Sequence, residues 1–133
     1  MHAGAVEALD EFELAAACDI DPDRCRQARE RFGCETFDDY RCMLRQAAPE
    51  LLVVVTRSDQ HAEMTCDGLN AGCHVLVTKP WALNADEAQR MIRTARSAGR
   101  VLMPWLPARF SCDLRRIREL IADGAVGEVF LIR

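Results

Sequence analysis

The chain has 133 residues, half of them hydrophobic, with 17 basic and 21 acidic side chains and a formal net charge of −4. This size and composition predict a globular protein with a real core, and the mixed charges offer no basic stripe for nucleic acid or an anionic membrane. The longest apolar runs are only as long as a strand, and the first residues lack the pattern of a signal peptide. We therefore expect no membrane span and a cytoplasmic location.

Seven cysteines raise the question of a metal site or of disulfides. No two of them are closer than seven residues, so no Cys-x-x-Cys pair occurs, and their number is odd. Several fall on apolar faces of predicted helices or strands, where cysteine behaves as a small hydrophobe. We expect buried free thiols and no metal site.

The first part of the chain predicts a helix, a strand and a second helix. The short helix covers residues 1–9 and the strand covers residues 12–18, FELAAAC. The second helix, over residues 23–32, has Asp21 as its N-cap, a proline at its first position and Gly33 as its stop.

The middle of the chain predicts a strand between two helices. Thr36 or Asp38 caps the first helix, which reaches about Ala47. Residues 51–55, LLVVV, are apolar without a break, as in a strand that a parallel sheet buries on both faces. The helix over residues 59–70 is expected to turn three residues inward: Met64, Leu69 and Ala71.

Two more strands enclose a helix in the following part. The strands are expected at residues 75–77 and 101–103. The helix over residues 85–98 has Asn84 or Asp86 as its N-cap and ends at a glycine.

The last predicted elements are a helix over residues 111–122 and a strand over residues 129–132. The helix is expected to turn four apolar side chains inward: Leu114, Ile117, Leu120 and Ile121. Strands that alternate with helices of this length predict an α/β fold in which helices flank a parallel sheet.

Lys79 directly follows the apolar strand at residues 75–77 and precedes Pro80. Open α/β sheets bind their ligands at the carboxyl ends of the strands, and a proline keeps the residue before it extended. Lys79 is therefore a candidate ligand-binding residue. Taken alone, the pattern is more typical of a solvated lysine before a loop proline.

Asp19 ends the predicted strand at residues 12–18. In dinucleotide-binding folds, an acid at this place accepts hydrogen bonds from the adenosine ribose, about twenty residues after a Gly-x-Gly-x-x-Gly loop. That glycine pattern is absent from the sequence, and Gly4 alone cannot replace it. By itself, Asp19 fits the turn from a strand to a helix equally well.

Five segments together resemble the cofactor domain of the glucose-fructose oxidoreductase/inositol dehydrogenase/MocA (Gfo/Idh/MocA) family. They are CDIDPDR at 18–24, VVVTRSDQH at 53–61, AGCHVLVTKP at 71–80, AGRVLM at 98–103 and IADGAVGEV at 121–129. Order and spacing match over nearly the whole chain. The resemblance implies a Rossmann-type domain that binds NAD or NADP, in an oxidoreductase acting on the CH–OH group of a sugar, cyclitol or related polyol.

The resemblance also implies which residues meet the cofactor. Asp19 would lie on the adenosine ribose, with Ile20 and Arg24 near the adenine. The pyrophosphate and nicotinamide ribose would pass the loop and helix start that carry Thr56, Ser58 and His61. His61 would otherwise be a half-buried helix histidine. The acid at position 19 repels a 2′-phosphate and so favours NAD over NADP, although Arg24 is near enough in sequence to soften this.

Thr78, Lys79 and Pro80 match the family's Glu-Lys-Pro, whose lysine lies beside the nicotinamide and the substrate hydroxyl. By this resemblance Lys79 is the catalytic residue, and Thr78 and Pro80 lie with it against the cofactor. Arg109 matches an arginine that commonly lies near the cofactor; a surface cation is the alternative.

Three departures from the family stand out. The family's first strand and glycine loop have no counterpart, because Met1 aligns just after that loop. Thr78 stands where the family has glutamate, which removes a carboxylate that could hold the lysine. The sequence also stops within the first strand of the family's second, α+β domain. We therefore expect an incomplete cofactor domain at residues 1–127 and one strand of an absent domain at residues 128–133.

Two kinds of function remain open. The chain is either the cofactor-binding portion of an oxidoreductase or a catalytically inactive remnant or interaction module. In the Rossmann order, the strand without a counterpart lies between the strands at 12–18 and 51–55. Its loss would expose unpaired backbone groups, so we expect the isolated chain to bind NAD(H) weakly or not at all and to be poorly stable, self-associating or both.

Overall fold

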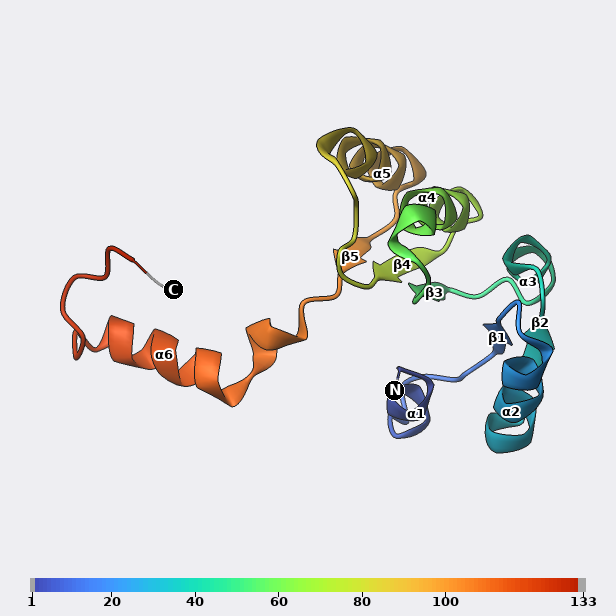
Figure 1. Ribbon diagram of the computed structural model, residues 1–133, viewed down its shortest axis with the longest axis horizontal. Helices are drawn as coiled ribbons and strands as arrows, with labels where there is room; N and C mark the ends of the chain where they lie inside the picture. The colour runs from blue at the N-terminus through green and yellow to red at the C-terminus, as the bar shows by residue number, and fades with distance from the viewer. Residues whose placement is uncertain (1, 132–133) are drawn as a thin grey trace.

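The computed structural model describes residues 2–131 (Figure 1). It consists of short parallel strands, helices packed on them and a last helix that lies apart from both sheets. The helices are α1 (His2–Glu7), α2 (Pro22–Phe32), α3 (Tyr40–Gln46), α4 (His61–Asn70), α5 (Ala85–Ala98) and α6 (Cys112–Ala122), with 3₁₀ turns η1 (Ser58–Gln60) and η2 (Pro107–Phe110). The strands are β1 (Ala16–Cys18), β2 (Glu35–Phe37), β3 (Leu51–Val54), β4 (His74–Val77) and β5 (Leu102–Pro104).

The strands form two parallel sheets, which confirms the predicted α/β class. β1 pairs with β2, with Ala17 opposite Thr36. β4 lies between β3 and β5 and pairs with both, with Val75 opposite Leu52 and Leu102. Within the described residues, β1 and β3 belong to different sheets. The division falls where the Rossmann order places its first strand.

Helix caps lie where the sequence places them in α2 and α5. The Asp21 carboxylate accepts a hydrogen bond from the Asp23 N–H at the start of α2, and Gly33 ends the helix with a φ of 67°. The Asn84 side chain accepts from the Glu87 N–H at the start of α5. These side-chain bonds satisfy N–H groups that a helix start leaves without a partner.

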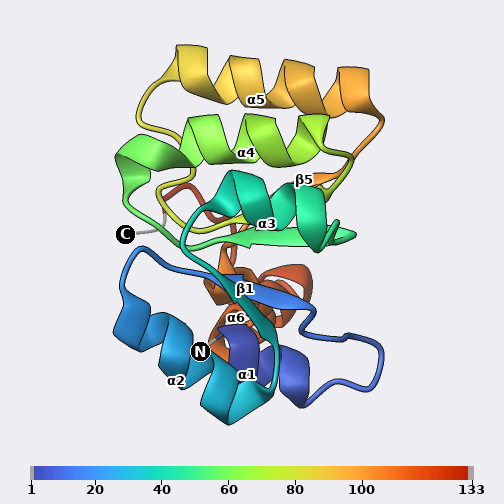
Figure 2. The same ribbon diagram turned by 90° about the vertical axis from the view of Figure 1, so that its right-hand side faces the viewer.

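The core lies between α4, α5 and the three-stranded sheet. Val75 and Val77 of β4 are 1% and 0% exposed, and Leu69 of α4 and Met91 of α5 are 0% exposed. Figure 2 shows α5 stacked on α4 and α4 stacked on the strands. A Cβ on Gly68 would lie 2.5 Å from Leu52 Cδ2, so the glycine lets α4 approach β3 closely.

The region around β1 differs from its prediction. Only Ala16–Cys18 of the predicted strand at residues 12–18 is β1, and Phe12 is 50% exposed. Thr36 lies in β2, a three-residue strand where a helix start was predicted, and the N-cap of α3 is Asp39. The Asp39 carboxylate accepts hydrogen bonds from the Arg41 and Cys42 N–H groups. Asp38, the predicted cap one residue earlier, does not accept these bonds.

Two burial predictions were wrong. β3 is buried on one face only, with Leu52 and Val54 inside and Leu51 38% exposed, because no described helix covers its other face. Ala71, predicted to point inward, is exposed because it follows the last residue of α4.

α6 also lacks its predicted core contacts. Ile117 and Ile121 are 44% and 37% exposed, and no residue of α6 is buried. Figure 1 shows why: α6 extends away from both sheets. Residues 129–131 form no strand, and Ile132 of that predicted strand lies outside the described residues.

The cysteines are free thiols, but few are buried. Cys34 and Cys73 are buried, Cys112 is exposed and the others are half-buried: Cys18, Cys25, Cys42 and Cys66. Burial raises the pKa of the Cys73 thiol. The expectation of core thiols therefore holds fully for two of the seven.

Candidate functional site

The predicted site residues follow the carboxyl ends of β1, β3 and β4. Asp19 follows β1, Thr56 comes two residues after β3, and Thr78 follows β4. β1 lies in the two-stranded sheet and β3 and β4 in the three-stranded one, so each residue follows the carboxyl end of a parallel strand, where α/β folds place their ligands.

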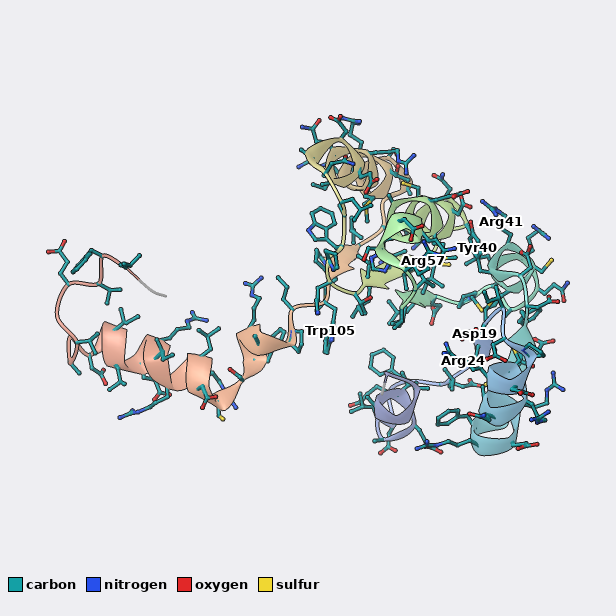
Figure 3. All side chains as sticks on the ribbon, in the orientation of Figure 1. Asp19, Arg24, Tyr40, Arg41, Arg57 and Trp105 are labelled. Atoms are coloured by element: carbon teal, nitrogen blue, oxygen red, sulfur yellow. The ribbon has the colours of Figure 1, made fainter. Side chains whose placement is uncertain are left out.

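Asp19 is held in position by its own loop. Its Oδ1 accepts a hydrogen bond from the Asp21 N–H at 3.0 Å, and its Oδ2 lies 3.3 Å from Arg24 Nη1, as Figure 3 shows beside β1. The Asp19 side chain remains 32% exposed. Each carboxylate oxygen accepts more than one hydrogen bond, so Asp19 keeps capacity for a ligand. Ile20 beside it is 90% exposed, which leaves an apolar surface next to the acid.

Three acidic side chains lie near the end of β1. The pKa of the Cys18 thiol is raised to about 11, first by burial, then by the neighbouring Cys25 and by the charges of Asp39, Asp19 and Asp38. Each of these carboxylates opposes a second negative charge at Cys18.

His61 joins the loops after β3 and β4. It is 1% exposed at the first residue of α4, so it is fully buried and not half-buried. Its Nε2 lies 3.0 Å from the Thr56 carbonyl oxygen and its Nδ1 lies 2.9 Å from the Pro80 carbonyl oxygen. The imidazole ring thus lies between the carbonyls of Thr56 and Pro80, the residue after Lys79, and the tautomer decides which of the two accepts from its N–H. The sequence could not show this, because both partners are backbone atoms.

Thr78 binds β3 and leaves Lys79 without a side-chain anchor. The Thr78 N–H and hydroxyl both donate to the Val54 carbonyl, each at 3.1 Å. Lys79 and Pro80 are exposed, and the peptide bond between them is cis. The structure therefore presents the Lys79 ammonium to solvent, from a loop that the bonds of Thr78 and His61 hold at both sides.

The remaining predicted residues are less closely grouped. Ser58 is half-buried at the start of η1. Arg109 is exposed on η2, between β5 and α6. Arg57, which the sequence reasoning passed over, is a cation after β3 that forms two hydrogen bonds to the Asp59 carboxylate at 3.2 and 3.1 Å.

Other features of the described residues do not involve the predicted site residues. A hollow of about 410 Å³ lies between α5 and β5, but none of the predicted site residues lines it. Across residues 2–131, no group of three or more His, Cys, Asp or Glu side chains is placed to hold a metal ion. No helix in this part of the chain is both long and apolar enough to cross a membrane.

Parallel strands flanked by helices, with an acid after β1 and polar loops after β3 and β4, define a domain of the Rossmann class. Residues 1–105 match the family model described as "Oxidoreductase family, NAD-binding Rossmann fold". The chain belongs to this Gfo/Idh/MocA family.

Known relatives place the chain within that family. It is 33% identical to the D-glucoside 3-dehydrogenase of Escherichia coli over 98% of this chain and 38% of the relative. The WlbA dehydrogenase of Bordetella pertussis, solved with NADH and UDP-GlcNAcA, has a TM-score of 0.90 and 28% identity over 97% of this chain and 38% of its own.

A third relative binds the other nicotinamide cofactor. The 3-ketoreductase of Actinomadura kijaniata, solved with NADP and TDP-benzene, has a TM-score of 0.88 and 29% identity over 95% of this chain and 39% of its own. The chain thus spans about two fifths of the length of these relatives, the part that forms their cofactor domain. The family contains binders of NAD(H) and of NADP.

Proposed function

We propose that this chain is the cofactor-binding portion of an NAD(P)-dependent oxidoreductase that acts on the CH–OH group of a sugar, cyclitol or related polyol. The observation that carries the proposal is that Asp19 directly follows β1 and Thr78-Lys79 follow β4, each at the carboxyl end of a parallel strand, in a chain of this family. The relatives named above act on sugars or bind sugar nucleotides, which supports the substrate class.

The residues present fit the adenosine end of a dinucleotide. Asp19 is partly exposed, fixed by Asp21 and Arg24, and able to accept further hydrogen bonds from ribose hydroxyls. Ile20 offers an apolar surface for the adenine. Thr56, Ser58, Thr78, Pro80 and Arg109 are the further candidates for contacts along the cofactor.

Lys79 is the proposed catalytic residue. The cofactor, when bound, supplies hydride transfer at its nicotinamide. Lys79 orients and polarises the substrate C–O group from its loop after β4. His61 fixes the Pro80 carbonyl and so helps to hold that loop.

The acid at the end of β1 favours NAD over NADP. Burial first, then Cys25 and the charges of Asp39, Asp19 and Asp38, raise the pKa of Cys18, and a 2′-phosphate would add a further negative charge near these carboxylates. Arg24 opposes this preference only in part, since it is paired with Asp19.

Binding by the purified chain tests the cofactor assignment. We expect saturation-transfer NMR to detect NADH binding weaker than micromolar, because the sequence has no glycine loop to hold the pyrophosphate. Asp19→Ala should abolish the saturation of adenosine protons, whereas Asp86→Ala, on the exposed start of α5, should not. Adenosine saturation that is the same in both variants would contradict the assignment of Asp19.

Turnover tests Lys79 in any active form of the protein that contains this chain. Lys79→Ala should lower turnover far more than cofactor affinity, because the ammonium acts on the reacting C–O group. Lys79→Arg should fail as well, since a guanidinium cannot replace a compact ammonium that exchanges a proton. If Lys79→Ala kept turnover within a few-fold of the parent, Lys79 would not be catalytic.

A further inference from the structure

The His61 side chain is a buried donor that faces two acceptors. The residue is 1% exposed, and both ring nitrogens lie at hydrogen-bond distance from backbone carbonyls. Nδ1 is 2.9 Å from the Pro80 oxygen, and Nε2 is 3.0 Å from the Thr56 oxygen. A carbonyl oxygen only accepts hydrogen bonds, so each contact needs a proton on the ring. All three residues lie within the part of the chain that matches the family model.

The buried ring has one proton to offer. A neutral imidazole donates from one nitrogen and presents a lone pair at the other. A second proton would bury a positive charge, which is costly without an acidic partner. Asp59, two residues before His61, is paired with Arg57. Glu63, two residues after it, is paired with Arg41. His61 is also the first residue of α4, where the positive end of the helix dipole opposes a cation.

The two carbonyls compete for this proton on nearly equal terms. Both are backbone oxygens, and their distances from the ring are 2.9 and 3.0 Å. With the proton on Nδ1, the ring holds Pro80 and with it the loop that carries Lys79. With the proton on Nε2, the ring holds Thr56 and the loop after β3. The other carbonyl then faces a lone pair and receives no hydrogen bond from the ring.

A ligand that donates a hydrogen bond to the Thr56 carbonyl would change this competition. Thr56 is exposed at the carboxyl end of β3, where the proposed cofactor passes. Ribose hydroxyls and the carboxamide of a nicotinamide dinucleotide are donors of this kind. An acceptor without a partner gains more from such a donor than one that is already satisfied. The ligand therefore favours the tautomer that has its proton on Nδ1.

We propose that His61 is a two-position switch between the loops after β3 and β4. In the free chain its proton is shared between Nδ1 and Nε2. A ligand donor on the Thr56 carbonyl shifts the ring to Nδ1–H, which fixes the Pro80 carbonyl. One proton leaves Nε2 and one is bound at Nδ1, so the ring stays neutral.

The switch makes His61 a positioning residue for Lys79. The loop that carries Lys79 is held most firmly when a ligand occupies the loop after β3. By linkage, a firmly held Lys79 loop also strengthens binding of that ligand. The ligand step rests on the proposed function, in which the ligand is a nicotinamide dinucleotide, whereas the shared proton does not.

Nitrogen NMR of the imidazole rings in the full chain tests the shared proton. At about pH 8, where an ordinary imidazole is neutral, both His61 nitrogens should be partly protonated. The His61→Gln variant assigns the signals by their loss. His74 is the matched control, because its Nδ1 accepts from the Val101 N–H at 3.0 Å and its proton is therefore fixed on Nε2. Full protonation of both His61 nitrogens, or a proton fixed on one of them, would overturn the proposal.

Addition of NADH tests the ligand step. Protonation of His61 Nδ1 should increase, amide exchange in residues 79–82 should slow, and the His74 signals should stay unchanged. Saturation of adenosine protons reports binding independently. NADH that binds by this criterion and leaves His61 unchanged would overturn the switch. A complete lack of NADH binding would contradict the proposed function and with it the ligand step, while the spectrum of the free chain still decides whether the proton is shared.

Discussion

The half of the molecule built on β4 and the half built on β1 bury very different amounts of their apolar surface. In the first, β4 has a strand on each side, and α4 and α5 bury Leu69, Met91, Val75 and Val77 to 1% exposure or less. In the second, β1 has one strand partner, and α2 has no buried residue. α6, which packs on neither sheet, has none either.

The difference follows the packing partners of each helix: α3, α4 and α5 lie on strands and have buried residues, whereas α6 packs on no strand and has none. α5 and α6 both have charged faces opposite apolar ones, and both begin at a capped N-terminus. Only α5 has a three-stranded sheet and α4 beneath it. Helical periodicity predicts which face is apolar, but it does not predict the partner that covers that face.

The largest expected effect is the loss of a core side chain from the β4 half. Met91→Ala should lower the free energy of unfolding by about 2–5 kcal/mol, because it leaves a cavity between α5 and the sheet. Ile117→Ala, its counterpart on α6, should lower it by less than about 1 kcal/mol, since that side chain is 44% exposed. Urea unfolding of both variants makes the comparison, and equal losses would show that α6 packs as tightly as α5.

A smaller, local effect is expected where His61 lies between the loop after β3 and the loop after β4. His61→Gln should lose the bridge between the Thr56 and Pro80 carbonyls and lower stability by about 1–3 kcal/mol. Amide exchange should rise in both loops at once while α5 stays protected. His74→Gln, which replaces the Nδ1 that accepts from the Val101 N–H at the start of β4, is the control and should leave both loops unchanged.

The smallest expected effect concerns Tyr40, which joins α3 to α4. Its hydroxyl donates to the Asp67 carboxylate at 2.8 Å, so Tyr40→Phe should lower stability by about 1 kcal/mol. Figure 3 shows Tyr40 beside Arg41, which forms an ion pair with Asp67 at 3.1 Å.

The same contact predicts a pH dependence. Burial first, then the hydrogen bond and charge of Asp67, raise the pKa of Tyr40 above its ordinary value near 10. A raised pKa stabilises the fold fully below the ordinary value, and this stability is lost as the pH rises through the folded-state pKa. Tyr40 is the only tyrosine, so phenolate absorbance reports it directly. Titration at an ordinary tyrosine pKa in the folded chain would contradict the contact.

Much of the fold was predictable because local signals agreed with it. Asp21 and Gly33 bound α2 as predicted, and the apolar runs at β3 and β4 became paired strands. β2 was missed because its three residues, Glu35–Phe37, are too few to show alternation. The inward faces of α6 and β3 were wrong because burial depends on a neighbour that no local pattern encodes.

The candidate site was predictable only as a set of positions. The places of Asp19 and Lys79 after their strands followed from the strand pattern and the family resemblance. The roles of His61 and Thr78 as ties between loops and strands did not, because their partners are the backbone carbonyls of Thr56, Pro80 and Val54. A pattern of residue types does not predict which backbone carbonyl a side chain will contact.

Hydrogen exchange of individual amides tests the division of the sheet most directly. The Val75 N–H donates to the Val101 carbonyl at 2.9 Å and the His74 N–H donates to Glu50, so both should be strongly protected. Val54 faces β4 and Asp19 faces β2, so by alternation the Val53 and Cys18 N–H groups point to strand edges that have no partner among residues 2–131. These two amides should exchange much faster than those of Val75 and His74. Val53 and Cys18 amides protected as strongly as Val75 would show that β1 and β3 are paired, and that the sheet is not divided between them.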